Sequence, residues 1–192
     1  MKPFSKLKPM GQDNSRKKDN VVYSSGGIDF VEYDGWHFIN DKDMVVCLIY
    51  LIEENKFLLR MEYIPPFKFK DSDDYFLTAI GGSMEAGEST ETAMLREIEE
   101  EAGIVIRPDF KIEFMKPLFV SKSNSAKYYP SIITLTERDY HEIKPTGDGS
   151  KYEEMSKTVK IDMQYLNSIN PSDLITQYLV DKFKDYMNMN VN

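Results

Sequence analysis

Two long apolar runs in the first half of the chain predict a pair of β-strands. They lie within residues 43–64 and are separated by Glu53, Glu54 and Asn55. Apolar runs of strand length, bounded by polar turn residues, are typical of paired strands of which at least one is buried on both faces. We therefore expect a hairpin at the centre of a sheet, with Cys47 buried as a small apolar side chain.

Shorter segments with the same character predict further strands. Residues 28–39 fit two short strands joined by a turn at Asp34-Gly35, and we expect Trp36 to pack in the core. Pro65 and Pro66 open a polar loop over residues 65–74. The strand expected at 75–80 runs straight into Gly81 and Gly82. Other strands are expected at residues 112–120, 131–137 and 158–161.

The period of the pattern changes from two to that of a helix between Ser89 and Ala102. Met94, Leu95, Ile98 and Ala102 fall within an arc of about 100° on a helical wheel, and Gly103 supplies a stop. Residues 163–169 also have helical character. A final helix is expected over residues 172–187, with Ser172 as its N-cap after Pro171.

This order of elements indicates an α/β or α+β fold, with strands in the middle and helices near the end. We expect one domain over residues 21–192. Residues 1–20 carry six lysines and arginines and few large apolar side chains, so we expect them to form a mobile arm.

Composition and charge restrict the function. The 192 residues carry a net charge of −8, which opposes a general nucleic-acid-binding surface. A small anionic substrate remains compatible with this charge if a metal ion screens the repulsion. The chain has one cysteine, and we find neither a signal-peptide pattern nor a membrane span, so we expect a soluble protein of the cytoplasm.

Seven glutamates lie between residues 81 and 104, and three of them cluster on the predicted helix. Glu97, Glu100 and Glu101 share one arc beside the apolar stripe, whereas Glu99 points away. A solvated acidic helix face is the ordinary interpretation. However, every charged residue from 97 to 101 is acidic, and hard cations such as Mg²⁺ bind carboxylates together with substrate phosphates. We expect Glu85, Glu91 and Glu99 to be solvated and the clustered three to need a cation.

The spacing of these residues resembles that of a known family. Residues 82–104 match the Nudix box, G-x5-E-x7-R-E-U-x-E-E-x-G-U with U a bulky aliphatic residue, at every fixed position. The matching residues are Gly82, Glu88, Arg96, Glu97, Ile98, Glu100, Glu101, Gly103 and Ile104. The resemblance implies an α/β/α sandwich around a mixed sheet, with the box forming a loop–helix–loop. It also implies an enzyme that hydrolyses a nucleoside diphosphate linked to another moiety.

Carried over residue by residue, the resemblance assigns roles within the box. Glu97, Glu100, Glu101 and the carbonyl of Gly81 would bind Mg²⁺, with Mn²⁺ as the alternative ion. Arg96 and Glu97 belong to the catalytic residues, and an ion pair from Glu88 to Arg96 would orient the helix. Gly82 and Gly103 would support the shape of the box.

Outside the box, residues 58–66 resemble the R-x-x-Y-R-x-P segment of ADP-ribose and nucleoside-diphosphate-sugar pyrophosphatases. Arg60, Tyr63 and Pro66 match, and Ile64 stands where that group has arginine. Arg60 and Tyr63 are therefore expected to bind substrate. The acidic stretch at residues 152–161 resembles the loop that carries a further catalytic glutamate, which makes Glu153 or Glu154 the candidate general base.

Three functions remain open at this point. The first is a pyrophosphatase for ADP-ribose or a nucleoside-diphosphate sugar, and the second is hydrolysis of mRNA caps or dinucleoside polyphosphates. Only the basic arm at residues 2–18 favours RNA. The third is a nucleotide-sensing module without catalysis, although no carboxylate of the box is missing. The expected partner is a small nucleotide rather than a membrane, and the family resemblance allows a homodimer through the N-terminal regions.

Overall fold

The computed structural model describes residues 21–25, 28–70, 73, 75–147 and 155–189. Its centre is a seven-stranded sheet in which β12, β5, β4, β10 and β9 follow one another, while β6 pairs with β5 and β7 with β4. β4 and β10 are parallel and the other pairs of this sheet are antiparallel, so the sheet is mixed. Its strands are β4 (Met44–Leu51), β5 (Lys56–Glu62), β6 (Phe76–Thr78), β7 (Ile80–Ser83), β9 (Leu118–Phe119), β10 (Lys127–Leu135) and β12 (Lys157–Asp162).

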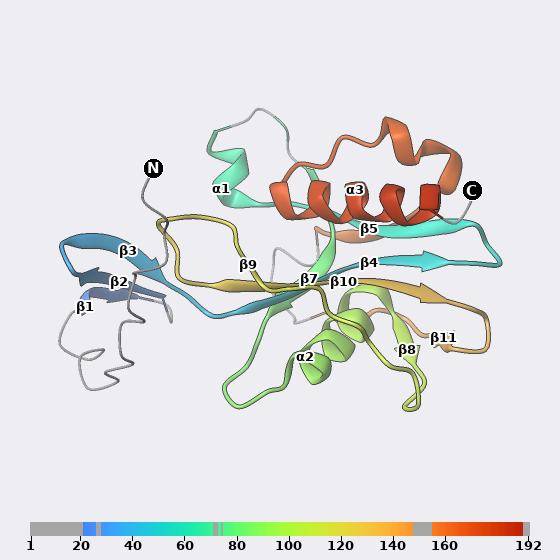
Figure 1. The fold of residues 1–192 in the computed structure, drawn as a ribbon, viewed down its shortest axis with the longest axis horizontal. Helices are drawn as coiled ribbons and strands as arrows, with labels where there is room; N and C mark the ends of the chain where they lie inside the picture. Colours follow the sequence, from blue (N-terminus) through green and yellow to red (C-terminus); the bar gives the residue numbers. More distant parts are fainter. Residues whose placement is uncertain (1–20, 26–27, 71–72, 74, 148–154, 190–192) are drawn as a thin grey trace, which may run out of the picture.

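Helices cover both faces of this sheet (Figure 1). On one face lies α2 (Thr90–Glu97), which continues without a break into a wide π-helical turn (Ile98–Ala102). On the other face lies α3 (Leu174–Met189). The fold is therefore the α/β/α sandwich around a mixed sheet that the box implied.

Alternation along the central hairpin builds a core on each side of the sheet. In β4, Val45, Cys47, Ile49 and Leu51 pack with α2, whereas Val46 and Leu48 pack towards α3. Successive strand residues point to opposite faces, so a continuous apolar run is what a strand covered on both sides requires. The expected hairpin and the buried Cys47 are both confirmed.

A second, three-stranded sheet precedes the central one and lies beside it at one end of the molecule (Figure 1). It contains β1 (Val21–Ser25), β2 (Ile28–Tyr33) and β3 (Trp36–Asn40). The turn at Asp34-Gly35 is confirmed, with φ of 52° and 76°. β1 was not predicted. The expectation that Trp36 packs in the core is wrong, because the residue is 65% exposed on this small sheet.

The strands predicted after the hairpin differ from the structure in length. The strand expected at 75–80 is divided at Ala79, so that β6 pairs with β5 and β7 with β4. The strand expected at 112–120 is reduced to β9 and a single bridge from Phe114 to Ser131. Two further short strands, β8 (Ile104–Ile106) and β11 (Tyr140–Glu142), pair with one another and were not predicted.

Two helical features also need correction, whereas the helical character expected at residues 163–169 is confirmed. The expected loop after Tyr63 contains α1 (Pro65–Lys68), because proline is tolerated in the first turn, where its missing N–H needs no partner. Residues Met163–Ser168 form a 3₁₀ helix. The side chain that caps α3 is Asp173, which accepts a hydrogen bond from Thr176 N at 2.9 Å. Ser172 Oγ instead accepts one from Leu77 N of β6 at 2.9 Å.

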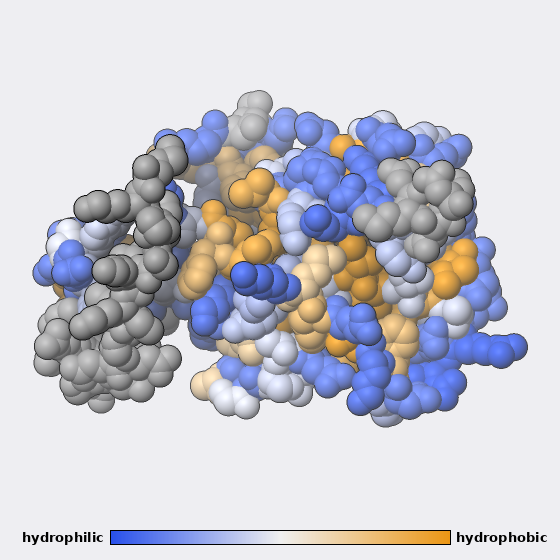
Figure 2. All heavy atoms as spheres, in the orientation of Figure 1, coloured by the Kyte–Doolittle hydropathy of each residue, from blue (hydrophilic) through white to orange (hydrophobic). Residues whose placement is uncertain are grey.

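Apolar surface remains near α1 and β9, between the two sheets (Figure 2). No helix within the described residues is long and apolar enough to cross a membrane. The predicted arm at residues 1–20 lies outside the described residues. That residues 21–192 form one domain stays a prediction.

Candidate active site

The predicted helix begins and ends where local signals place it. Ser89 caps α2 by accepting a hydrogen bond from Thr92 N at 3.1 Å. Gly103 ends the π-helical turn with φ of 64°, and a Cβ at this position would lie 2.5 Å from Ile143 O. This position requires glycine, because its backbone is left-handed and a carbonyl oxygen occupies the space that a Cβ would need.

Two glycines of β7 bring the backbone against the glutamates of the helix. A Cβ on Gly82 would overlap the carboxylate of Glu97, and one on Gly81 would overlap the backbone of Val45 and Val46. Gly81 N donates a hydrogen bond to Glu101 Oε2 at 3.0 Å. The strand and the helix thus meet with carboxylates between them.

One guanidinium group gathers three glutamates of the box. Arg96 Nε and Nη2 each donate to one carboxylate oxygen of Glu88, both at 3.0 Å. Arg96 Nη1 donates to Glu97 Oε1 at 2.7 Å and to Glu100 Oε2 at 3.1 Å. The hydrogen bonds from Arg96 hold the pKa of Glu88 below its usual range.

Burial opposes ionisation of two of the glutamates. Glu97 and Glu101 are each 8% exposed. Burial raises the pKa of Glu101 to about 8, with the charges of Glu62 and Glu97 adding to the shift and Arg60 opposing it. Burial also raises the pKa of Glu97, against the hydrogen bond from Arg96. A bound cation would offset the energetic cost of ionising these two buried carboxylates.

The donor set therefore fits a hard divalent ion. The oxygen atoms of Glu97, Glu100 and Glu101 and the Gly81 carbonyl are the ligand types that Mg²⁺ and Mn²⁺ accept. Among the described residues, no group of three or more acidic, histidine or cysteine side chains is arranged so that it could hold a metal ion. The contacts explain why: Arg96 draws Glu97 and Glu100 towards itself, whereas Glu101 turns towards Gly81 and Arg60.

The two residues expected to bind substrate line the same cavity but differ in burial. Tyr63 lines a cavity of about 440 Å³ together with Gly81, Gly82 and the three clustered glutamates. Arg60 also lines this cavity but is only 4% exposed, and its Nε lies 3.3 Å from Glu62 Oε1 and 3.4 Å from Glu101 Oε1.

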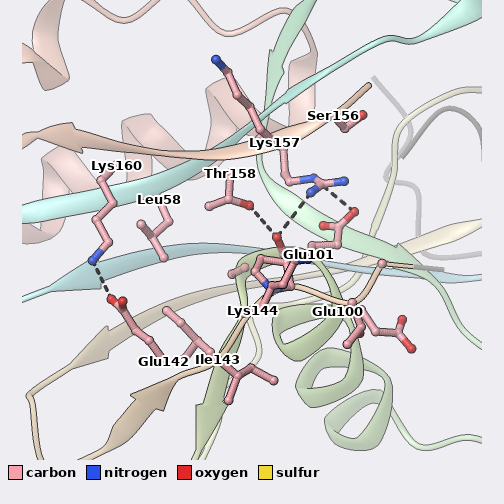
Figure 3. Close-up of a pocket in the computed structure, with 17 residues that line it drawn as sticks. Leu58, Glu100, Glu101, Glu142, Ile143, Lys144, Ser156, Lys157, Thr158 and Lys160 are labelled. Atoms are coloured by element: carbon pink, nitrogen blue, oxygen red, sulfur yellow. Dashed lines mark hydrogen bonds and ion pairs between the residues drawn. The ribbon is translucent and has the colours of Figure 1, made fainter. Parts of the chain in front are cut away.

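A larger cavity of about 740 Å³ adjoins the first one (Figure 3). The two share Arg60, Glu100, Glu101 and Ser156 in their walls. At the far end of the larger cavity, Lys160 donates to Glu142 at 2.6 Å and to Glu54 at 2.7 Å. Glu153 and Glu154, the candidate general bases, lie outside the described residues.

Sequence reasoning missed three polar residues around the glutamates. Thr158 Oγ1 donates to Glu101 O at 2.7 Å, and Thr78 Oγ1 donates to Glu62 Oε2 at 2.9 Å. The positions of Thr158, Thr78 and Glu62 next to one another depend on the register between strands. The sequence predicts strands here but does not determine which residues face each other. Glu62 stands within the R-x-x-Y segment, which was the one available signal.

Comparisons with known proteins identify the family and the fold. The family model of the NUDIX domain matches residues 42–157, more than half of the 192 residues. Among solved structures, an ADP compounds hydrolase is similar, with a TM-score of 0.62 and 17% identity over 88% of this chain and 91% of that one. At this identity the likeness shows a shared fold.

A second similar structure is MutT, from work on Aliivibrio salmonicida and Vibrio cholerae. It has a TM-score of 0.48 and 20% identity, over 73% of this chain and 97% of that one. No curated protein sequence matches the chain.

Proposed function

Because the chain belongs to the NUDIX domain family and is a Nudix pyrophosphohydrolase, we propose that it cleaves nucleoside diphosphates joined to another moiety. The proposed substrate is ADP-ribose or a nucleoside-diphosphate sugar. The observation that carries the proposal is the meeting of Glu97, Glu100 and Glu101 with the Gly81-Gly82 backbone beside an open cavity. The similar ADP compounds hydrolase supports the choice of substrate class through its fold alone.

Glu97, Glu100, Glu101 and the Gly81 carbonyl would hold Mg²⁺, or Mn²⁺ in its place. When bound, such an ion polarises a phosphoryl oxygen and lowers the pKa of a coordinated water. In this proposal Arg96 orients Glu97 and Glu100, and Glu88 fixes Arg96 from the other side. Tyr63 would contact the nucleotide, since it lines the cavity next to Gly82.

The general base would come from Glu153 or Glu154. Gly147 and Ser156 flank the segment that carries them, and both line the larger cavity beside Glu100 and Glu101. Gly147 N also donates to Glu100 O at 3.0 Å, which ties that flank to the helix. A base must reach the attacking water directly or through one further water, and these anchors support either glutamate.

A substrate panel tests the proposal. Purified protein is incubated with ADP-ribose, a nucleoside-diphosphate sugar, a diadenosine polyphosphate and capped RNA, each with Mg²⁺ and with Mn²⁺. We expect metal-dependent release of AMP from ADP-ribose, or of a nucleoside monophosphate from the sugar nucleotide. Faster cleavage of capped RNA or the diadenosine compound would select the alternative hydrolase, and nucleotide binding without turnover would select the sensor.

The protein is further proposed to act as a homodimer in the cytoplasm. Support for the dimer comes from the β1–β3 sheet, where Val22, Tyr23 and Trp36 are each at least 60% exposed. A small sheet with so much apolar surface gains stability when a partner covers it. Support for the compartment comes from the single cysteine, Cys47. It is buried and cannot form a disulfide within the chain, which is compatible with a reducing compartment.

A further inference from the structure

Three residues form a row across neighbouring strands beneath the end of the catalytic helix. Arg60 of β5 lies opposite Thr158 of β12 on one side and opposite Thr78 of β6 on the other. Residues paired across adjacent strands share one face of a sheet. All three side chains therefore lie on the same face of the sheet, where Arg60 lines both cavities and Thr158 lines the larger one.

Two members of this row hold Glu101 through its backbone. Thr158 Oγ1 donates to Glu101 O at 2.7 Å, and Arg60 Nη1 donates to the same oxygen at 3.3 Å. Figure 3 shows the Thr158 hydroxyl directed at this carbonyl. The last carbonyls of a helix have no partner within the helix, so these donors fix the end of the π-helical turn.

Arg60 also holds the side chain of Glu101, and Glu62 holds Arg60. Arg60 Nε lies 3.4 Å from Glu101 Oε1 and 3.3 Å from Glu62 Oε1. The other oxygen of Glu62 accepts the hydroxyl of Thr78 at 2.9 Å. The guanidinium group of Arg60, a residue that is 4% exposed, thus lies between two carboxylates, one of which is anchored to the next strand.

We infer that Arg60 and Glu62 are positioning residues for Glu101, and that Thr158 fixes the same end of the helix. The inference rests on the proposed function and changes the role expected for Arg60. A substrate phosphate would have to compete with two carboxylates for a buried cation, and removing one partner from a buried pair is costly. Arg60 therefore acts on the reaction through the placement of Glu101.

The test separates metal placement from substrate binding. Glu62→Gln, Thr158→Val, Arg60→Lys and Arg60→Met are compared with wild-type protein in two measurements. The first is the binding of Mn²⁺ in the absence of substrate, followed by electron paramagnetic resonance of the free ion. The second is kcat and KM for ADP-ribose, or for whichever substrate of the panel is cleaved. Arg107→Met and Thr134→Val make the same chemical changes elsewhere, since Arg107 is an exposed partner of Asp109 and Thr134 lines a cavity beside α3.

We expect Glu62→Gln and Thr158→Val to weaken Mn²⁺ binding and to lower kcat, each by about tenfold, with KM little changed. Arg60→Lys should retain more Mn²⁺ affinity than Arg60→Met, and the two control variants should match wild type. Glu62→Gln and Thr158→Val keep the shape of the side chain, so they answer the question even if Arg60→Met does not fold.

A substrate-binding role for Arg60 predicts the opposite pattern. KM would rise in both Arg60 variants, whereas Mn²⁺ affinity would stay at the wild-type value in all four. That result, with wild-type protein active, overturns the inference and leaves the proposed hydrolase intact. Wild-type protein that binds no Mn²⁺ and cleaves nothing would overturn both.

Discussion

Burial divides the glutamates of residues 81–104 into three groups, with Glu88 and Glu100 half-buried between the two extremes. Glu97 and Glu101 are buried, whereas Glu85, Glu91 and Glu99 are exposed, as we expected. The unbroken run from 99 to 101 is therefore a poor guide to the site, because its first member faces solvent. Position on the helix, rather than local density of charge, decides which carboxylates face the glycine backbone of β7.

Glu101→Gln tests the buried carboxylate whose pKa is raised to about 8. We expect the variant to fold, because the amide is close in shape and the folded protein already disfavours the charge at this position. Turnover should fall by about 10²–10³-fold, as for the loss of one direct stabilising contact in a transition state. Circular dichroism checks the fold and a substrate assay checks turnover. Glu99→Gln is the matched control, and similar activities of the two variants would contradict the metal assignment.

Stability of the metal-free protein should fall as pH rises. The pKa of Glu101 is raised from 4.5 to about 8, so the folded state keeps a proton that the unfolded state loses. The free energy of unfolding therefore decreases between pH 4.5 and pH 8. Each kcal/mol lost should lower Tm by roughly 2–4 °C in a chain of this size.

In the proposed site Mg²⁺ would bind the ionised carboxylate, so the rise in Tm that it produces should be larger at pH 8 than at pH 5.5. Thermal unfolding with Mg²⁺ or with a chelator measures both effects. Glu101→Gln should remove most of the pH dependence. A wild-type Tm that rises with pH in the chelator would contradict the assignment.

At the scale of single elements, the sequence was sufficient to predict those features that depend only on neighbouring residues. Ser89 and Gly103 set the ends of the box helix, and Asp34-Gly35 sets the turn between β2 and β3. The apolar run of β4 was readable because both of its faces are covered. Each of these features depends on residues only a few positions apart.

Features that depend on distant segments could not be predicted in this way. Asp173, rather than Ser172, caps α3 because Ser172 is engaged by β6 from another part of the chain. The contact from Thr158 to the helix end depends on the register of β12 against β5. The box motif named the glutamates, but only the folded sheet brings Arg60 and Glu62 to Glu101.

Gly103→Ala should destabilise the protein more than Gly87→Ala. Both glycines have positive φ, 64° and 83°, which costs an alanine about 1–2 kcal/mol. Gly87 faces open space, whereas a Cβ on Gly103 would also meet Ile143 O and Pro145. The added overlap should cost Gly103→Ala roughly 1–3 kcal/mol more. Denaturant unfolding measures both variants, and equal losses would contradict the close approach at Gly103.

For the whole molecule, the two sheets have very different environments. The central sheet buries a core on both faces, whereas within the described part of β1–β3 only Val31 is buried. The small sheet is attached to the rest through Ile39, whose backbone bonds to Ser123 and Ser125. Its exposed apolar residues are the observation on which the proposed dimer rests.

Trp36→Glu should shift the protein from dimer to monomer. The indole is 65% exposed, and a charge in a covered interface would be expensive to desolvate. Phe69→Glu is the matched control, because Phe69 is 82% exposed but lies after α1, outside the small sheet. Light scattering after size-exclusion chromatography gives the mass. A monomeric wild type, or a dimeric Trp36→Glu variant, would contradict the proposed assembly.

The placement of Arg96 bears on how the chain is made in the cell. Its guanidinium already supplies a positive charge to Glu88, Glu97 and Glu100, three of the carboxylates that crowd the box. A newly synthesised chain can therefore complete this part of its fold without waiting for an ion from the surroundings. Under the proposed metal binding, biosynthesis and activation are separate events: the supply of the polypeptide follows translation, and the active fraction follows the concentration of free divalent ions.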